Sequence, residues 1–127
     1  MVPDDSMVTR AAKALLAVRS RVRWKTGKDL RHLEKRKLLR HLPPDASMED
    51  YNDLIAGIAH DDTAFVYDYL FGVKEYFAVA GVVDGTDWLV IFSLDGLMET
   101  AFPPDDMGWY IADQRMVTVG RVGDILK

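Results

Sequence analysis

The spacing of apolar residues changes at Thr63, and this change constrains the fold more than any other feature of the chain. Before it, apolar residues recur at helical intervals. After it, Phe65, Tyr67 and Tyr69 occupy alternate positions, as in a half-buried strand. Helices followed by antiparallel hairpins form the α+β pattern. We therefore expect N-terminal helices packed on one face of a four- to five-stranded antiparallel sheet.

The length of 127 residues is enough for one domain with its own core and too short for two typical domains. We expect a single α+β domain over residues 1–127, with a helical part at 1–62 and a sheet part at 63–127.

Three helices are expected in the helical part. Thr26 and Asp29 have the spacing of a capping box, as do Ser47 and Asp50. Pro43 cannot continue a helix, so it ends the second one. The expected bounds are about 5–22 with Asp5 or Ser6 as the first cap, 26–42, and 47–60.

Two Asp-Gly pairs predict tight turns in the sheet part. Asp84-Gly85 and Asp95-Gly96 each stand between apolar runs, which is a strong hairpin signal. The strands are expected at 65–69, 76–83, 88–92 and 97–102, with further short strands at 109–111 and 116–119 and a strand or turn at 122–126.

The net charge of −4 is unevenly distributed along the chain. Residues 1–46 hold 12 Lys or Arg and 5 Asp or Glu, a net of +7, whereas residues 47–127 hold 4 and 15, a net of −11. An asymmetry of this size indicates either an anionic partner for the basic part or attraction between the two parts within the fold. The sequence leaves both interpretations open.

The composition excludes several classes of protein. There is no cysteine, which removes disulfides, thiolate catalysis and thiolate metal sites. No run of 18 apolar residues exists, so no membrane span is expected. The acidic residues 1–5 lack an apolar core, which argues against a secretory signal and favours a cytoplasmic location.

The second expected helix carries the main candidate site. His32 shares one helix face with Lys28, Lys35 and Arg36. These cations should lower the pKa of the imidazole and favour its neutral, basic form. They would also hold a phosphodiester and stabilise negative charge in its transition state. The alternative is a solvated histidine on a basic surface helix, and His41 near the helix end is interpreted as a bystander.

The hairpin at Asp95-Gly96 offers partners for His32. If the turn has two residues, Ser93 pairs with Met98 and Ile91 pairs with Thr100, so both hydroxyls lie on one face of the sheet. A hydroxyl at the end of a strand can bind a phosphate oxygen. The alternative for Thr100 is an ordinary strand residue.

Other kinds of site are not indicated. His60-Asp61-Asp62 and Pro104-Asp105-Asp106 lack the ligand spacing of a cation loop, and we interpret them as cap and turn residues. No phosphate-binding loop, dinucleotide fingerprint or nucleophile elbow is present. We therefore expect neither a metal nor a cofactor.

A series of short motifs resembles a known superfamily. The motifs are His32-Leu33-Glu34-Lys35-Arg36, Leu42-Pro43-Pro44, Met48-Glu49-Asp50-Tyr51, Trp88-Leu89-Val90-Ile91-Phe92, Asp95-Gly96 and Glu99-Thr100-Ala101-Phe102-Pro103-Pro104. In this order, over roughly residues 20–105, the chain resembles the barnase–EndoU–colicin–RelE superfamily of small metal-independent ribonucleases, particularly its phage-associated and toxin branches.

The resemblance implies two helices on a four-stranded antiparallel sheet and cleavage of RNA by general acid–base catalysis. The 2′-hydroxyl would attack the adjacent phosphate and leave a 2′,3′-cyclic phosphate and a 5′-hydroxyl. The implied catalytic residues are His32, Arg36 and Thr100, and the implied substrate-binding residues are Lys28, Lys35, Ser93 and Lys74.

The implied partners are RNA, with tRNA as one candidate, and a cognate antitoxin or immunity protein; no membrane is involved. The acidic second part supports an alternative. Active nucleases of this kind are usually basic, so the chain is otherwise a non-catalytic, immunity-like or antitoxin-like domain that binds a protein through its acidic sheet.

Overall fold

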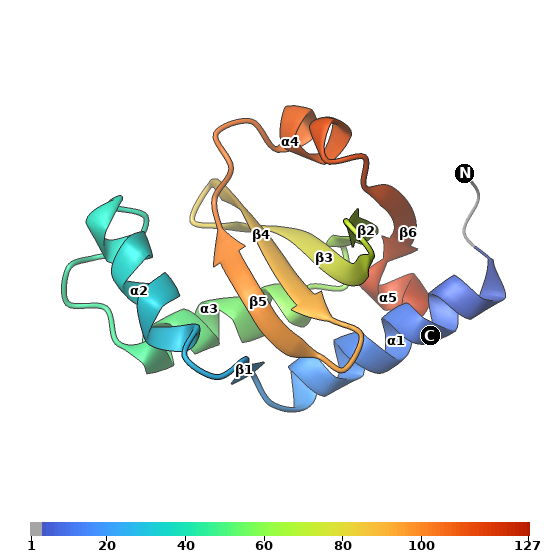
Figure 1. The fold of residues 1–127 in the computed structure, drawn as a ribbon, viewed down its shortest axis with the longest axis horizontal. Helices are drawn as coiled ribbons and strands as arrows, with labels where there is room; N and C mark the ends of the chain where they lie inside the picture. The colour runs from blue at the N-terminus through green and yellow to red at the C-terminus, as the bar shows by residue number, and fades with distance from the viewer. Residues whose placement is uncertain (1–3) are drawn as a thin grey trace.

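The structure is a computed structural model that describes residues 4–127 (Figure 1). The expectation about a secretory signal rests in part on residues 1–3, which lie outside the described residues. The elements are α1 (Asp5–Ser20), β1 (Arg23–Trp24), α2 (Asp29–Leu38), α3 (Met48–Ala59), β2 (Phe65–Phe71), β3 (Lys74–Val83), β4 (Thr86–Ser93), β5 (Leu97–Phe102), α4 (Met107–Asp113), β6 (Val117–Arg121) and α5 (Val122–Ile125).

The α+β class is confirmed, but the sheet is larger than expected and mixed. In the described chain it has six strands in the order β1-β5-β4-β3-β2-β6. All neighbouring strands are antiparallel except β1, which runs parallel to β5 and pairs Arg23 with Leu97 and Trp24 with Met98. The expectation of four to five antiparallel strands was wrong because a two-residue strand has no period that a sequence pattern can reveal.

The sheet is covered on both faces (Figure 1). The helices α1 and α3 lie on one side, where Leu15, Ile55, Phe77 and Phe92 are fully buried in the main core. The helix α4 lies on the other side, over a smaller cluster that includes Tyr69, Tyr76 and Ile91. The expected packing of N-terminal helices on one face is confirmed for α1 and α3, whereas the cover of the other face by α4 was not expected.

The wrong assignment of α4 explains this difference. Residues 109–111 were expected to form a strand, but they belong to a helix. Asp106 begins that helix, since its Oδ1 accepts a hydrogen bond from the Trp109 amide at 3.0 Å. The interpretation of Asp106 as a cap residue is thus confirmed. The expected strand at 116–119 is confirmed as β6, and residues 122–125 form the short helix α5.

The second helix begins and ends differently from its predicted bounds. Lys28 stands at its N-cap without a side-chain hydrogen bond, so Thr26 does not cap it. It ends at Leu38 because Arg40 adopts a left-handed φ of 60°. The Arg40 amide bonds to the Lys37 carbonyl at 3.0 Å and the His41 amide to the Arg36 carbonyl at 2.8 Å, which is a Schellman motif. This turn brings His41 back beside the helix.

Of the remaining predicted caps and turns, one capping box and one turn are confirmed, and the cap of α1 differs. In α3 the capping box of Ser47 and Asp50 is confirmed. The turn at Asp84-Gly85 has two residues with positive φ and is flanked by a Val83–Thr86 pair, as expected. The helix α1 is capped by Asp4 instead of Asp5 or Ser6, since Asp4 Oδ1 accepts a hydrogen bond from the Met7 amide.

Ion pairs join the two oppositely charged parts of the chain. Four of the five salt bridges within residues 4–127 connect a cation of residues 1–46 to an acid of residues 47–127. They are Arg10–Glu75, Arg19–Asp62, Lys25–Glu99 and Lys28–Glu99. Attraction between the parts therefore accounts for some of the charge asymmetry.

None of the helices in residues 4–127 combines the length and apolarity needed to cross a membrane.

Candidate active site

His32 and Thr100 are in direct contact although 68 residues separate them. The Nδ1 atom of His32 on α2 lies 3.0 Å from the Oγ1 atom of Thr100 on β5. The ring of Trp24 stacks on the imidazole, with the two ring centroids 5.8 Å apart. The Nε1 atom of Trp24 donates a hydrogen bond to Asn52 Oδ1 at 2.9 Å. The imidazole is therefore held in orientation from two directions.

A β-bulge in β5 places Thr100 for this contact. Phe92 pairs with Met98 and Ile91 pairs with Thr100, so Glu99 is an extra residue in the ladder. The expected Ser93–Met98 pair is wrong because Leu94, Asp95 and Gly96 form a longer turn, whereas the expected Ile91–Thr100 pair is confirmed. The bulge brings both Glu99 and Thr100 to one face of the sheet, where they line the same small hollow.

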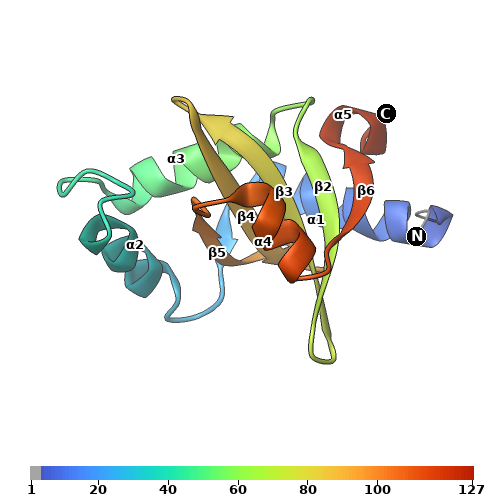
Figure 2. The same ribbon diagram turned by 90° about the horizontal axis from the view of Figure 1, so that it is seen from above.

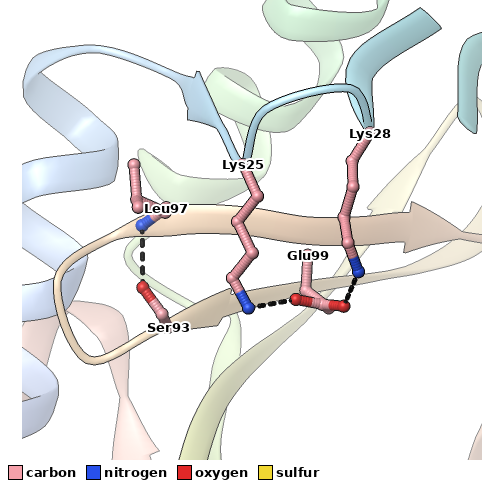
Figure 3. Close-up of polar contacts among 5 residues, drawn as sticks. All are labelled: Lys25, Lys28, Ser93, Leu97 and Glu99. Carbon is pink, nitrogen blue, oxygen red and sulfur yellow. Dashed lines mark hydrogen bonds and ion pairs between the residues drawn. The ribbon is translucent and has the colours of Figure 1, made fainter.

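Glu99 pairs with Lys25 and Lys28, as Figure 3 shows, and it thereby neutralises part of the positive charge that acts on His32. Its carboxylate accepts hydrogen bonds from the Nζ atoms of both Lys25 and Lys28. Burial alone would raise the pKa of Glu99, but these two lysines hold it below its ordinary value. Burial alone would lower the pKa of Lys25, and the bond to Glu99 raises it instead. The three groups together carry one surplus positive charge.

The pKa of His32 lies below its ordinary value. Burial is the largest cause, followed by the charges of Lys28, Arg31 and Arg36, and Glu99 opposes them. Lys35 was expected to contribute to this lowering, but Arg31 contributes in its place, and the effect of burial was not expected. At neutral pH the imidazole is thus mainly uncharged and able to accept a proton.

The remaining cations of α2 face a separate cleft. Lys35 and Arg36 line a cleft of about 530 Å³ between α2 and α4, together with His41, Phe102 and Trp109. Arg36 is 4% exposed, and its guanidinium lies 5.7 Å from the centre of the Phe102 ring. The predicted site is therefore divided into a pair, His32 and Thr100, and a neighbouring basic cleft.

Two predicted residues do not join His32. The Oγ atom of Ser93 accepts from the Leu97 amide at 3.1 Å and so holds the β4–β5 turn (Figure 3). Lys74 is exposed opposite Phe71 at the end of the β2–β3 hairpin, which extends away from α2 (Figure 2).

Lys25 and Glu99 were not among the predicted site residues, and His41 was interpreted as a bystander. Glu99 follows Met98 in an alternating strand, so without the bulge it would be assigned to the opposite face from Thr100. His41 reaches the cleft because of the left-handed Arg40, a conformation that non-glycine residues seldom adopt. Neither feature has a local sequence signal.

No group of three or more metal-ligating side chains gathers within residues 4–127. No family model, curated protein or solved structure matches the chain.

Proposed function

We propose that this protein is a metal-independent endoribonuclease of the toxin type, as its resemblance to the barnase–EndoU–colicin–RelE superfamily implies. The observation that supports this most is the contact between His32 Nδ1 and Thr100 Oγ1 at 3.0 Å, beside several cations. A largely neutral, oriented imidazole next to positive charge suits proton transfer at a phosphodiester.

His32 acts as the general base in this proposal. When its Nδ1–H donates to Thr100 Oγ1, the lone pair of Nε2 is free to accept the proton of an RNA 2′-hydroxyl. The O2′–P bond then forms as the P–O5′ bond breaks, and the departing O5′ takes a proton from water. The products are a 2′,3′-cyclic phosphate and a 5′-hydroxyl.

The cations act on the phosphate rather than on protons. Lys28, with Lys25 and Glu99, presents one surplus positive charge beside the imidazole. Arg36 is close enough to lower the pKa of His32, and it would stabilise negative charge on the phosphoryl oxygens. Lys35, at the edge of the cleft, would bind the adjoining backbone.

The test is incubation of purified protein with tRNA and total RNA in EDTA, with the RNA ends identified chemically. Cleavage should leave cyclic phosphate ends and fall by at least about a hundredfold in His32→Ala. His60→Ala is the matched control, because His60 is exposed at the end of α3 and should retain full activity.

Two outcomes contradict the proposal. Robust cleavage by a folded His32→Ala variant would remove the mechanism. A folded wild-type protein that cleaves none of a broad set of RNAs, but binds a basic protein through acidic side chains, would instead support the non-catalytic, immunity-like alternative.

A further inference from the structure

We propose that the cleft between α2 and α4 is a nucleotide subsite, in which Arg36 binds a phosphate and Trp109 stacks on the base. This inference deepens the proposed function and rests on it for its link to RNA, but the binding itself is measured without cleavage. The residues that carry it are Arg36, His41, Phe102 and Trp109.

Arg36 is a buried cation that lacks a counter-ion. It is 4% exposed, and within residues 4–127 it forms no salt bridge. Its Nε atom has no hydrogen-bond partner among the described residues. The ring of Phe102 offsets only part of the cost of burying this charge. Because Arg36 lines the cleft, an anion there would supply the counter-ion that its guanidinium lacks, and a guanidinium matches the geometry of phosphate well.

His41 adds a second unsatisfied group to the same cleft. Its Nδ1 atom is buried and has no hydrogen-bond partner within residues 4–127. The Schellman turn at Arg40 holds the residue beside Arg36, whose carbonyl accepts from the His41 amide. Two unpartnered polar side chains that line one cleft are typical of a site built for a ligand rather than for packing.

The opposite side of the cleft offers aromatic surface. Trp109 is 64% exposed although it lies on a helix that packs against the sheet. Exposed indole rings are suitable platforms for nucleobases, because every base has a face that can stack. The volume of about 530 Å³ lies within the range of ordinary small-ligand sites.

Two carboxylates, Asp105 and Asp106, also line the cleft. Their negative charge opposes the binding of an anion, which gives a prediction about the direction of an affinity change. Asp106 is engaged at the start of α4, where it accepts from the Trp109 amide. Asp105 is exposed and close enough to His41 to oppose the lowering of its pKa. Its negative charge should repel a bound phosphate, so removing that charge should tighten binding.

The experiment measures binding of adenosine 5′-monophosphate, adenosine and inorganic phosphate by NMR and calorimetry. The nucleotide should bind about tenfold or more tightly than either fragment, because it uses both Arg36 and Trp109. Arg36→Met should lose the binding of both phosphate-bearing ligands while its urea midpoint stays unchanged or rises, since an apolar side chain replaces an unpaired buried charge. Trp109→Ala should remove the preference for the nucleotide over phosphate.

Two further variants, Asp105→Asn and Arg31→Gln, are tested for nucleotide binding in the same way. Asp105→Asn should tighten nucleotide binding about twofold to fivefold. Arg31→Gln is the matched control, because Arg31 is an exposed arginine of α2 that does not line the cleft, and it should bind as the wild type does.

Three outcomes would overturn the subsite. They are unchanged nucleotide affinity in Arg36→Met, equal affinity for adenosine and its monophosphate, and absence of saturable binding. His32→Ala separates the two proposals, because it should abolish cleavage and leave nucleotide binding intact. Nucleotide binding without any cleavage by the wild type would reject the nuclease and keep the subsite.

Discussion

The hydroxyl of Thr100 has a task that a β-branched hydrocarbon of the same shape cannot perform. Thr100→Val keeps the side-chain volume in β5 and removes the partner of His32 Nδ1. We expect RNA cleavage to fall about tenfold or more, because the imidazole loses its fixed orientation and tautomer. Thr100→Ser should restore most of the activity, since it keeps Oγ.

The measurements are the rate of cleavage and the NMR titration of the His32 ring protons. A merely structural role for Thr100 predicts a lower unfolding free energy and an unaltered His32 titration. Full activity in a folded Thr100→Val would contradict the assigned role.

Asp68 on β2 should make the protein less stable as the pH rises. The residue is 4% exposed, and burial, followed by the effects of Glu75, raises the pKa of its carboxyl to about 7. The pKa of an aspartate in the unfolded chain is about 3.9. The folded state therefore binds the proton more tightly. This contribution to stability is complete below about pH 4 and is lost as the pH rises through about 7.

Asp68→Asn should consequently raise the unfolding free energy at pH 8 by about 1–4 kcal/mol and change it little at pH 4. Urea unfolding at the two pH values measures the difference. Asp87→Asn is the control, since Asp87 is exposed on β4 and should alter neither value much. Equal effects of Asp68→Asn at both pH values would contradict the prediction.

At the level of elements, the turn at Gly96 is pressed against α1. Gly96 and Gly85 have nearly equal φ values, +78° and +79°. A Cβ at Gly96 would lie 2.6 Å from Ala17 Cβ and 3.1 Å from the Ala14 carbonyl oxygen, whereas nothing lies within 4 Å at Gly85. Replacing either glycine by alanine costs about 1–2 kcal/mol of backbone strain.

Gly96→Ala should cost about 1–3 kcal/mol more than Gly85→Ala, because α1 must move away from the β4–β5 turn. Urea unfolding of the two variants measures this difference directly. Equal losses of unfolding free energy would show that the packing of the turn against α1 carries no energetic weight.

Some local signals predicted their elements correctly, whereas the capping box expected at Thr26 and Asp29 did not form. The capping box of Ser47 and Asp50 and the turn at Asp84-Gly85 depend on residues close in sequence, and both formed as expected. The strand β1 exists because the edge of β5 lies beside it, and no local pattern records such a neighbour. The helix α4 was misread as a strand because its short aromatic run fits either period.

The site shows the same limit. His32 was a candidate by its chemistry and Thr100 was added by the resemblance, and the confirmed Ile91–Thr100 register allows them to meet. Glu99 was missed because the bulge reverses the face that alternation assigns to it. His41 was interpreted as a bystander, and its position in the cleft follows from the left-handed Arg40. A slip of one residue in a strand or turn decides which side chains share a site.

For the whole molecule, a net charge of −4 means that any RNA must bind through a local basic surface against the overall repulsion. The cations that the proposed site presents to the RNA backbone are Lys35, Arg36 and the single surplus charge of the Lys25, Lys28 and Glu99 cluster. These cations would contact about three phosphates. A plot of the logarithm of the binding constant against the logarithm of the salt concentration should therefore have a slope of about −2. Most of the acidic surface contributes only repulsion.

This prediction is checked by fluorescence anisotropy with a labelled single-stranded RNA and the His32→Ala variant, which prevents cleavage during the titration. Adding Lys35→Ala should reduce the slope by about 0.7, because one phosphate contact is lost. Adding Lys13→Ala should leave the slope unchanged, since Lys13 is exposed on α1, away from the cleft. A slope near zero, or equal effects of the two lysines, would mean that the basic face of α2 does not bind the RNA backbone.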